Sequence, residues 1–241
     1  MTQRADKLLY SRGLCKSRSA AQALIAEGKV LYNGRLIYKP SELLDEDGDL
    51  RITESLKYVS RGGYKLEHAL NRFGIDVEGD VCADIGASTG GFTDCLLQRG
   101  AKIVDAIEGG HGQLDSTLEN EKRVISIENF NARELDSKTL PELCDTVVMD
   151  VSFISQTLLH KNVYVILKNG GKFITLIKPQ FEAGRENINK RGMANENSYD
   201  DVKNKVISSA KSCGFKFIDI DESAIKGGDG NTEFIAYFIK N

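Results

Sequence analysis

The sequence predicts an α/β protein of two domains: a small α+β domain, then a larger doubly wound domain on a mostly parallel, seven-stranded sheet with helices on both faces. The chain has 241 residues, too many for one typical domain and too few for two large ones. Asn33-Gly34 between apolar runs indicates an early β-hairpin. From residue 81 onward, apolar runs of strand length alternate with helical segments, as in βαβ units.

The first domain is predicted to contain two short helices and the hairpin. Residues 4–12 suit a helix that ends at Gly13, and Ser17 is a suitable N-cap for a second helix over residues 19–25. Asparagine and glycine at positions 33–34 favour a type I′ turn, because both residue types tolerate a positive φ. The expected order is therefore helix, helix, hairpin.

The domain boundary is expected after a short acidic turn. This turn and a strand over residues 50–52 precede a polar stretch that reaches about residue 60. We therefore expect the first domain over residues 1–55, a linker over residues 56–60 and the second domain over residues 61–241.

In the second domain, seven apolar runs are expected to form the strands of the sheet. A glycine-rich loop alone separates the last two runs, which favours an antiparallel hairpin at the sheet edge. The seven expected strands are residues 81–85, 103–107, 124–127, 146–149, 173–177, 215–220 and 234–239.

Charge is distributed unevenly along the chain. The formal net charge is −3, yet residues 1–39 carry eight basic side chains against two acidic ones, Asp6 and Glu27. A basic segment on an otherwise acidic protein favours a polyanionic partner, although a merely solvated basic face would look the same.

Cysteine and histidine usage excludes several classes of protein. The five cysteines are odd in number and never spaced as Cys-x-x-Cys, and the three histidines lack metal-ligand spacing. We therefore expect neither a disulfide framework nor a bound metal. The apolar runs are of strand length and the N-terminus has no apolar leader. These features predict no membrane span and a cytoplasmic location.

A glycine loop follows the strand at residues 81–85. Its glycines let the backbone approach a ligand at the carboxyl end of the strand, where α/β sheets bind ligands. Gly86, Gly90 and Gly91 have the wrong spacing for a dinucleotide fingerprint, and no Gly-Lys-Ser/Thr of a phosphate loop follows.

Acidic residues at the ends of two neighbouring strands are typical of the S-adenosylmethionine pocket in Rossmann-like methyltransferases. Asp84 leads into the glycine loop, and Glu108, at the end of the next strand, can accept both ribose hydroxyls. Asn131 is a candidate for the adenine end. The expected cofactor-binding residues are Asp84, Gly86, Ala87, Ser88, Gly90, Gly91, Phe92, Glu108, Asn131 and Asp150.

Two further charged residues end the fourth and fifth strands and so face the same sheet edge: Asp150 and Lys178. With Lys65 and Glu233 they resemble the Lys-Asp-Lys-Glu tetrad of FtsJ-like ribose 2′-O-methyltransferases. Longer segments resemble the TlyA (haemolysin A) family over nearly the whole chain. These segments are residues 58–67, 86–97, 150–155, 178–185 and 230–234.

The resemblance implies an S-four-type RNA-binding domain joined to a Rossmann-like class I methyltransferase domain. It implies S-adenosylmethionine as cofactor, ribosomal RNA or a ribosomal subunit as partner, and cytidine ribose as substrate. The short N-terminus resembles that of the family's shorter type, which implies 23S rather than 16S ribosomal RNA as the first expected target. The expected RNA contacts are Arg4, Lys7, Arg12, Lys16, Arg18, Lys29, Arg35, Arg61 and Arg185.

The tetrad's residue types suit methyl transfer to a hydroxyl. The 2′-hydroxyl must lose a proton as it attacks the methyl group, and a lysine accepts that proton only when burial or a neighbouring cation favours its neutral form. We assign Lys178 as the base and Lys65 as the neighbouring cation that holds the oxygen. Asp150 and Glu233 are expected to orient the two lysines.

Three alternatives remain at the level of sequence. Base methylation is disfavoured, because residues 150–153 lack the prolines of the Asp-Pro-Pro-Phe motif. A membrane-active haemolysin lacks support from any spanning segment. A ribosome-assembly factor with a silent catalytic domain is disfavoured by the intact tetrad.

Overall fold

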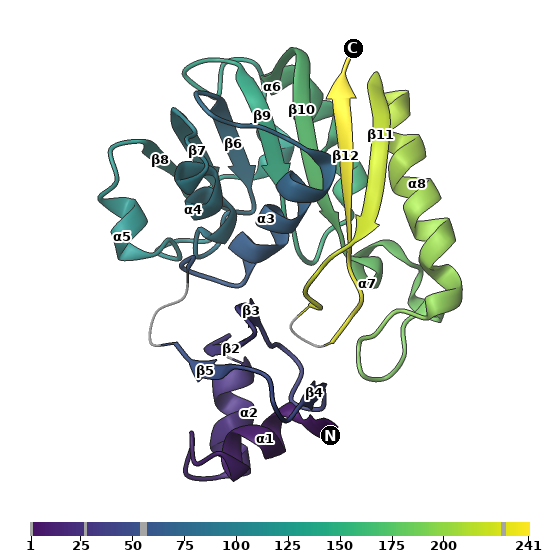
Figure 1. Cartoon of the computed structure of the whole chain (residues 1–241). Coiled ribbons are helices and arrows are strands. Elements are labelled where there is room, and N and C mark those ends of the chain that lie inside the picture. The colour runs from purple at the N-terminus through teal and green to yellow at the C-terminus, as the bar shows by residue number, and fades with distance from the viewer. Residues whose placement is uncertain (1, 27, 54–56, 228–229) are drawn as a thin grey trace. The chain divides into compact units, whose positions relative to one another are not determined.

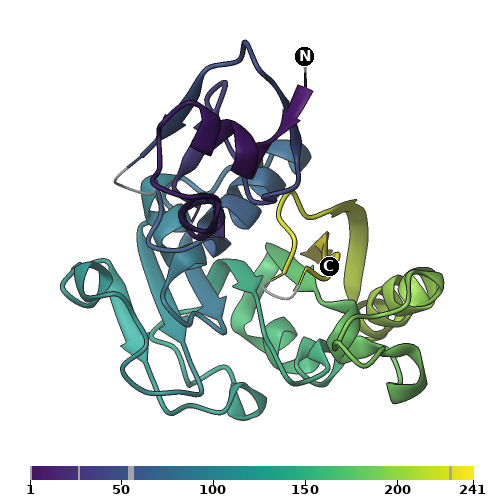
Figure 2. The ribbon, with the colours of Figure 1, turned by 90° about the horizontal axis from the view of Figure 1, so that it is seen from below.

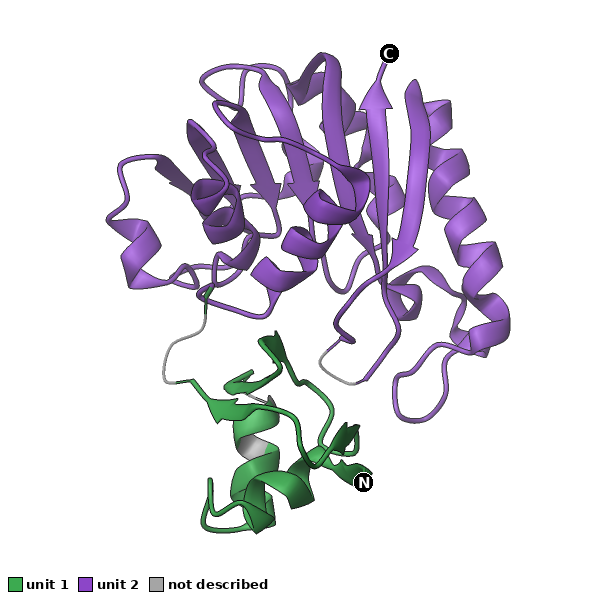
Figure 3. Cartoon of the chain, in the orientation of Figure 1, with its two compact units in different colours: residues 1–57 green, residues 58–241 purple. Residues whose placement is uncertain are grey.

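The computed structural model describes residues 2–26, 28–53, 57–227 and 230–241, and Figures 1 and 2 show the course of the chain. The chain divides into two compact units, residues 1–57 and 58–241 (Figure 3). The expected linker began at residue 56, which lies outside the described residues. Residues 58–60 of the expected linker belong to the second unit. Tyr58 is 1% exposed and packs in the core of that unit.

The first unit contains the expected helices and hairpin. Ser17 Oγ accepts a hydrogen bond from Ala20 N at 3.1 Å, and Asn33 and Gly34 have φ values of 49° and 79°, which confirms the predicted cap and turn. The elements are β1 (Thr2–Arg4), α1 (Ala5–Ser11), α2 (Arg18–Ala26), β2 (Val30–Tyr32), β3 (Arg35–Leu36), β4 (Leu43–Asp45) and β5 (Leu50–Ile52).

Two small antiparallel sheets complete the first unit. The hairpin strands β2 and β3 are joined by β5, and β1 pairs with β4. The sequence did not predict β1 and β4. The helix expected from residue 4 begins instead at Ala5, because Arg4 pairs with Leu43 in the β1–β4 ladder.

The second unit is a doubly wound domain, and it confirms the predicted fold class. Its seven strands run in the order β11-β12-β10-β9-β6-β7-β8 (Figure 1). The strands are β6 (Val81–Ile85), β7 (Ile103–Ile107), β8 (Val124–Ile127), β9 (Cys144–Met149), β10 (Leu167–Ile177), β11 (Phe215–Glu222) and β12 (Phe234–Lys240). Strand β12 is antiparallel to both neighbours, which confirms the expected terminal hairpin.

Helices of the second unit connect the strands. In both views α5 and α8 lie at opposite ends of the sheet (Figures 1 and 2). The helices and 3-10 turns are α3 (Gly62–Phe73), α4 (Gly91–Gln98), α5 (Ser116–Glu119), η1 (Ala132–Glu134), η2 (Gln156–Leu158), α6 (His160–Ile166), α7 (Pro179–Glu182), η3 (Arg185–Asn187), η4 (Glu196–Ser198) and α8 (Tyr199–Ser212).

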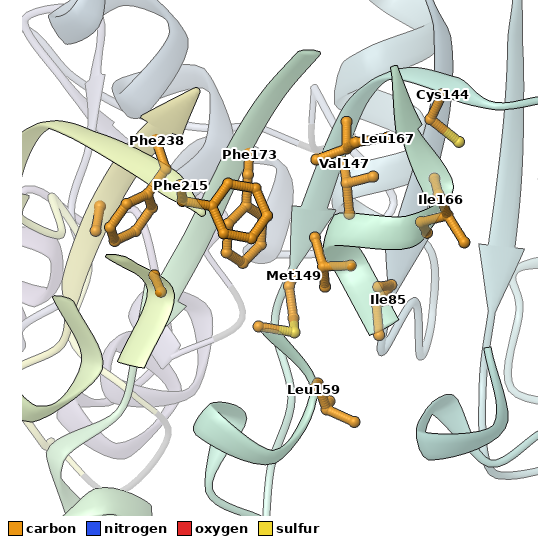
Figure 4. Close-up of a cluster of buried hydrophobic side chains, with 14 of the residues drawn as sticks. Ile85, Cys144, Val147, Met149, Leu159, Ile166, Leu167, Phe173, Phe215 and Phe238 are labelled. Atoms are coloured by element: carbon orange, nitrogen blue, oxygen red, sulfur yellow. The ribbon is translucent and has the colours of Figure 1, made fainter. Parts of the chain in front are cut away.

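Each face of the large sheet carries its own buried cluster of apolar side chains. The cluster on one face contains Val163 of α6 and Val206 of α8. In the same cluster the rings of Phe173, Phe215 and Phe238 lie side by side (Figure 4). On the other face Leu66 of α3 and Leu96 of α4 pack against the sheet. Burial on both faces explains why the central strands are continuous apolar runs. The parallel pairing of β9 with β6 and β10 places the carboxyl ends of the three strands along one edge.

Candidate active site

A pocket of about 260 Å³ lies at this carboxyl edge, wholly within the second unit. Most of its wall comes from the glycine loop, from the start of α3, and from the residues that follow β9 and β10. The lining residues are Ser60, Arg61, Gly62, Lys65, Gly86, Ala87, Ser88, Thr89, Gly91, Phe92, Asp150, Ser152, Lys178 and Lys226.

The glycine loop passes very close to the chain that follows β9. Gly86 has a φ of +84°, and a Cβ at this position would lie 2.6 Å from the carbonyl oxygen of Asp150. Only glycine therefore fits at position 86 without displacing the backbone. The close approach also brings the carboxylate of Asp150 to the same pocket as the loop.

Asp84 is fully buried beneath the loop. Its Oδ2 accepts hydrogen bonds from Thr93 N at 2.9 Å and from Thr93 Oγ1 at 2.7 Å. Burial raises the pKa of Asp84 to about 7 against the opposing effect of the Thr93 hydrogen bonds, and the nearby carboxylates of Asp150 and Glu108 add to the increase. Its Oδ1 is buried and has no hydrogen-bond partner in the described part of the chain.

Glu108, directly after β7, connects two loops of the site. Its Oε2 accepts a hydrogen bond from Ser88 N at 2.9 Å, and its Oε1 accepts one from Gly110 N at 2.8 Å. Each carboxylate oxygen keeps a further lone pair for a ligand hydroxyl. Glu108 itself does not line the pocket, and neither does Gly90.

Asn131, another expected cofactor residue, caps a short 3-10 turn. Its Oδ1 accepts a hydrogen bond from Arg133 N at 3.1 Å and so caps η1. Asparagine is common at such caps, and Asn131 is absent from the pocket lining.

The four tetrad residues form two ion pairs. Lys65 Nζ lies 2.6 Å from Glu233 Oε2, and Lys178 Nζ lies 2.5 Å from Asp150 Oδ1. Lys65 projects from α3, Glu233 directly precedes β12, and Asp150 and Lys178 directly follow β9 and β10. Both lysines line the pocket, so a hydroxyl bound there would meet two amines, each held by a carboxylate.

Some residues of the site were not singled out from the sequence. Ser152 accepts a hydrogen bond from Lys178 Nζ at 2.8 Å, and it lies within a segment already recognised by resemblance. Lys226 lines the pocket, and its carbonyl oxygen accepts a hydrogen bond from Arg61 at 2.9 Å. A lone lysine in a polar stretch gives no signal in the sequence.

Phe153 is 92% exposed, and its ring centroid is 5.0 Å from that of Phe181.

Several of the expected RNA contacts have partners within the first unit. Arg4 and Arg18 pair with the buried Asp6, each at 2.9 Å, and Arg35 pairs with Glu42. Arg12 donates to the carbonyl oxygens of Glu46 and Gly48.

The other expected RNA contacts differ in their positions. Lys7 and Lys16 are exposed, whereas Lys29 is partly buried. Arg61 lines the pocket of the second unit, whereas Arg185 lies on η3 outside it.

Neither a metal cluster nor a membrane-spanning helix was found in the described part of the chain. No group of three or more His, Cys, Asp or Glu side chains there could hold a metal ion. No helix there has the length and apolar character needed to cross a bilayer.

Comparison with known proteins agrees with the division of the chain into these two units. The FtsJ-like methyltransferase family matches residues 58–240, and the S4 domain family matches residues 3–50. Hemolysin A of Brachyspira hyodysenteriae is 43% identical, covering 98% of this chain and 99% of its own. The 16S/23S rRNA (cytidine-2′-O)-methyltransferase TlyA of Mycobacterium tuberculosis is 36% identical, covering 97% of this chain and 88% of its own.

The chain belongs to the TlyA (hemolysin A) family. Solved structures agree with the assignment. A protein of Streptococcus thermophilus named as a hemolysin has a TM-score of 0.77 and 42% identity, covering 100% of this chain and 89% of its own. Fibrillarin of Aeropyrum pernix, solved with S-adenosyl-L-methionine, has a TM-score of 0.56 at 17% identity, covers 87% of this chain and 94% of its own, and shares the fold alone.

Proposed function

We propose that this protein transfers a methyl group from S-adenosylmethionine to the 2′-hydroxyl of a cytidine in ribosomal RNA. The observation that carries the proposal is the pocket in which the Lys178–Asp150 and Lys65–Glu233 pairs meet the glycine loop. The names of the TlyA relatives support the substrate. The 23S RNA is the first expected target and the 16S RNA the second, which implies a cytoplasmic location.

The glycine loop and its neighbours fit the cofactor. Gly86 leaves room where a side chain would collide with Asp150, and Glu108 presents carboxylate oxygens beside the loop. Among the described residues, the buried Asp84 Oδ1 has no hydrogen-bond partner. S-adenosylmethionine supplies the methyl group when it is bound. Gly86, Ala87, Ser88, Gly91 and Phe92 would line its pocket, with Asp84 and Glu108 behind them.

Lys178, as a neutral amine, is the proposed acceptor of the proton from the 2′-hydroxyl, and the ammonium that results pairs with Asp150. Its amine lies at the pocket wall between Asp150 Oδ1 and Ser152 Oγ, so its position is fixed by two partners. Lys65 would hold the attacking oxygen, and Glu233 fixes Lys65 from a position that is 2% exposed. Fixed donors and charges aimed at a reacting oxygen are the chief means by which enzymes lower such barriers.

The first unit is proposed to bind the RNA. Its match to the S4 domain and the exposed Lys7 and Lys16 support this role. Arg61 and Lys226 at the pocket would contact the substrate chain near the reacting ribose.

A methylation assay with isotopically labelled cofactor tests the proposal. We would incubate the protein with ribosomal subunits from a strain that lacks the corresponding gene, and then map 2′-O-methylated cytidines by mass spectrometry. The expected result is one ribose-methylated cytidine for each subunit that serves as substrate. Label on a base, or on no nucleotide of either subunit, would contradict the proposal.

A further inference from the structure

A buried carboxylate next to the site has no part in the chemistry described so far. Glu182 ends α7, four residues after Lys178, and its side chain is 2% exposed. Its Oε1 accepts a hydrogen bond from Gln156 N at 2.7 Å, and its Oε2 accepts one from Ser155 Oγ at 2.6 Å. Glu182 therefore connects the chain after β10, which carries Lys178, to the chain after β9, which carries Asp150.

Lys205 of α8 compensates the buried charge of Glu182. Its Nζ lies 3.1 Å from Glu182 Oε2 and also donates to the carbonyl oxygen of Glu182 at 2.8 Å. An ionised carboxylate is costly to bury without such a partner. Lys205 therefore holds both the side chain and the backbone of Glu182 in place.

Gln156 attaches the same segment to β10 at two more points. Its Nε2 donates to the carbonyl oxygen of Leu176 at 3.1 Å, and its Oε1 accepts a hydrogen bond from Thr175 Oγ1 at 2.6 Å. Gln156 is 2% exposed, so water does not compete for these bonds. The carboxyl end of the segment formed by residues 150–156 is thus held by α7 and by β10.

The amino end of this segment is held as well, and its middle is strained. Asp150 N donates to the carbonyl oxygen of Ile85 at 3.0 Å. Between the two ends, Phe153 has a φ of +62°, a conformation that costs a non-glycine residue of the order of 1–3 kcal/mol. With its ring 92% exposed, Phe153 has little burial to offset this cost, so the anchored ends must maintain the conformation.

We propose that Glu182, held by Lys205, is a positioning residue for methyl transfer. It fixes residues 150–156 in the conformation in which Asp150 and Ser152 both meet the amine of Lys178. Glu182 and Lys178 lie on the same short stretch of chain. The hydrogen bonds that Glu182 accepts from Ser155 and Gln156 therefore fix the position of Lys178 relative to Asp150. The inference rests on the proposed function, since it assigns Glu182 a role in that same reaction.

Conservative variants of the full-length protein test this role. Glu182→Gln replaces one of the two acceptor oxygens by an NH₂ group, which cannot accept the hydrogen bond from Ser155 Oγ or Gln156 N. Ser155→Ala removes the hydroxyl donor. We expect kcat on ribosomal subunits to fall about 10- to 100-fold in Glu182→Gln, the scale of a small misplacement of reacting groups. The KM for RNA and the Kd for S-adenosylmethionine should stay close to the wild-type values. Ser155→Thr, which keeps the hydroxyl, should retain the wild-type kcat.

Asp80→Asn serves as the matched control for stability. Asp80 accepts a hydrogen bond from Thr146 Oγ1 at 2.6 Å and pairs with Lys172 at 2.7 Å, at the opposite end of the strands. This variant should lower the Tm but not kcat. Hydrogen exchange of residues 150–156 should accelerate in Glu182→Gln and stay unchanged in Asp80→Asn.

The outcomes separate the inference from the proposed function. A wild-type kcat in Glu182→Gln, or a raised KM alone, would overturn the positioning role. Equal losses of kcat in Glu182→Gln and Asp80→Asn at equal Tm would also overturn it, because stability would then explain both. A wild-type protein that methylates no ribosomal RNA would instead refute the proposed function.

Discussion

The two lysines at the pocket differ in how deeply their carboxylate partners are buried. Glu233 is 2% exposed in its side chain, whereas Asp150 is 21% exposed. Lys65 therefore faces the pocket while its carboxylate partner lies in the interior, whereas both Lys178 and Asp150 line the space that a substrate would enter. This difference supports Lys178, rather than Lys65, as the group that exchanges a proton with the substrate.

Lys178→Arg tests the assignment of the base. Arginine keeps the positive charge and can still pair with Asp150, but its guanidinium does not deprotonate in proteins. We expect single-turnover methyl transfer to fall at least about 100-fold, the lower range for general base catalysis. Calorimetric binding of S-adenosylmethionine and the Tm should remain close to wild type. A variant with near-normal turnover would leave Lys178 only an electrostatic role.

Asp84 predicts a pH dependence of stability. Burial raises its folded-state pKa to about 7, above the ordinary carboxylate value near 4. The stability associated with its protonated form is fully present below the ordinary value and is lost as the pH rises through about 7. Asp84→Asn cannot ionise, so its free energy of unfolding relative to wild type should rise by roughly 2 to 3 kcal/mol between pH 5 and pH 8. Denaturant titrations at both pH values measure this, and parallel curves for the two proteins would refute it.

Residues that follow strands were predicted better from the sequence than residues that depend on distant partners. Asp150 and Lys178 could be placed at the pocket because each ends an apolar run of a parallel sheet. Asn131 also follows a strand, but its short polar side chain satisfies a local backbone group, an alternative that the sequence alone does not distinguish. The ion pair between Arg18 and Asp6 joins different parts of the first unit, and no local sequence pattern predicts it.

At the scale of elements, the glycine loop can be tested with a matched pair of glycines. Gly86 and Gly79 have similar positive φ values, +84° and +75°, but a Cβ at Gly79 would meet nothing within 4 Å. Each glycine-to-alanine change should cost about 1 kcal/mol or more of stability through the backbone alone. Gly86→Ala should in addition lose S-adenosylmethionine binding, because its Cβ would lie 2.6 Å from the carbonyl oxygen of Asp150. Calorimetry of the two variants measures this difference, and equal cofactor affinity would show that the close approach is unnecessary.

Six strands of the large sheet were predicted within two residues, whereas β10 begins six residues before the expected residue 173, and the shortest strands were not predicted. The central strands β6 and β9 are buried on both faces, so each appears as an apolar run that the sequence reveals. Strands β1 and β4 have three residues each and pair across some 40 positions of the chain. Their formation depends on the fold of the whole first unit, which local sequence does not reveal.

At the scale of the whole molecule, the basic surface is smaller than the sequence count implied. Residues 1–57 contain ten basic and eight acidic side chains, because the acidic turn near residue 47 offsets the basic N-terminal segment. Arg4, Arg18 and Arg35 are each paired with a carboxylate. Any contribution of this unit to RNA binding must therefore come from particular exposed side chains rather than from net charge.

Lys7 and Lys16 are exposed on the first unit and test this view directly. In the full-length protein, the double variant Lys7→Gln/Lys16→Gln should weaken binding to ribosomal RNA and reduce the slope of log affinity against log salt by about 1 to 2, since up to two phosphate contacts are lost. Cofactor binding should not change, because the pocket lies wholly in the second unit.

Lys122→Gln/Lys138→Gln provides the matched control, with the same change in net charge on exposed lysines of the second unit. If net charge alone governed RNA affinity, the two double variants would weaken binding equally at every salt concentration. A larger loss of affinity and of salt slope for the Lys7/Lys16 variant is expected if the first unit positions its lysines on the phosphate backbone. Such contacts neutralise particular phosphates and release their counterions, an effect that a distant charge does not reproduce.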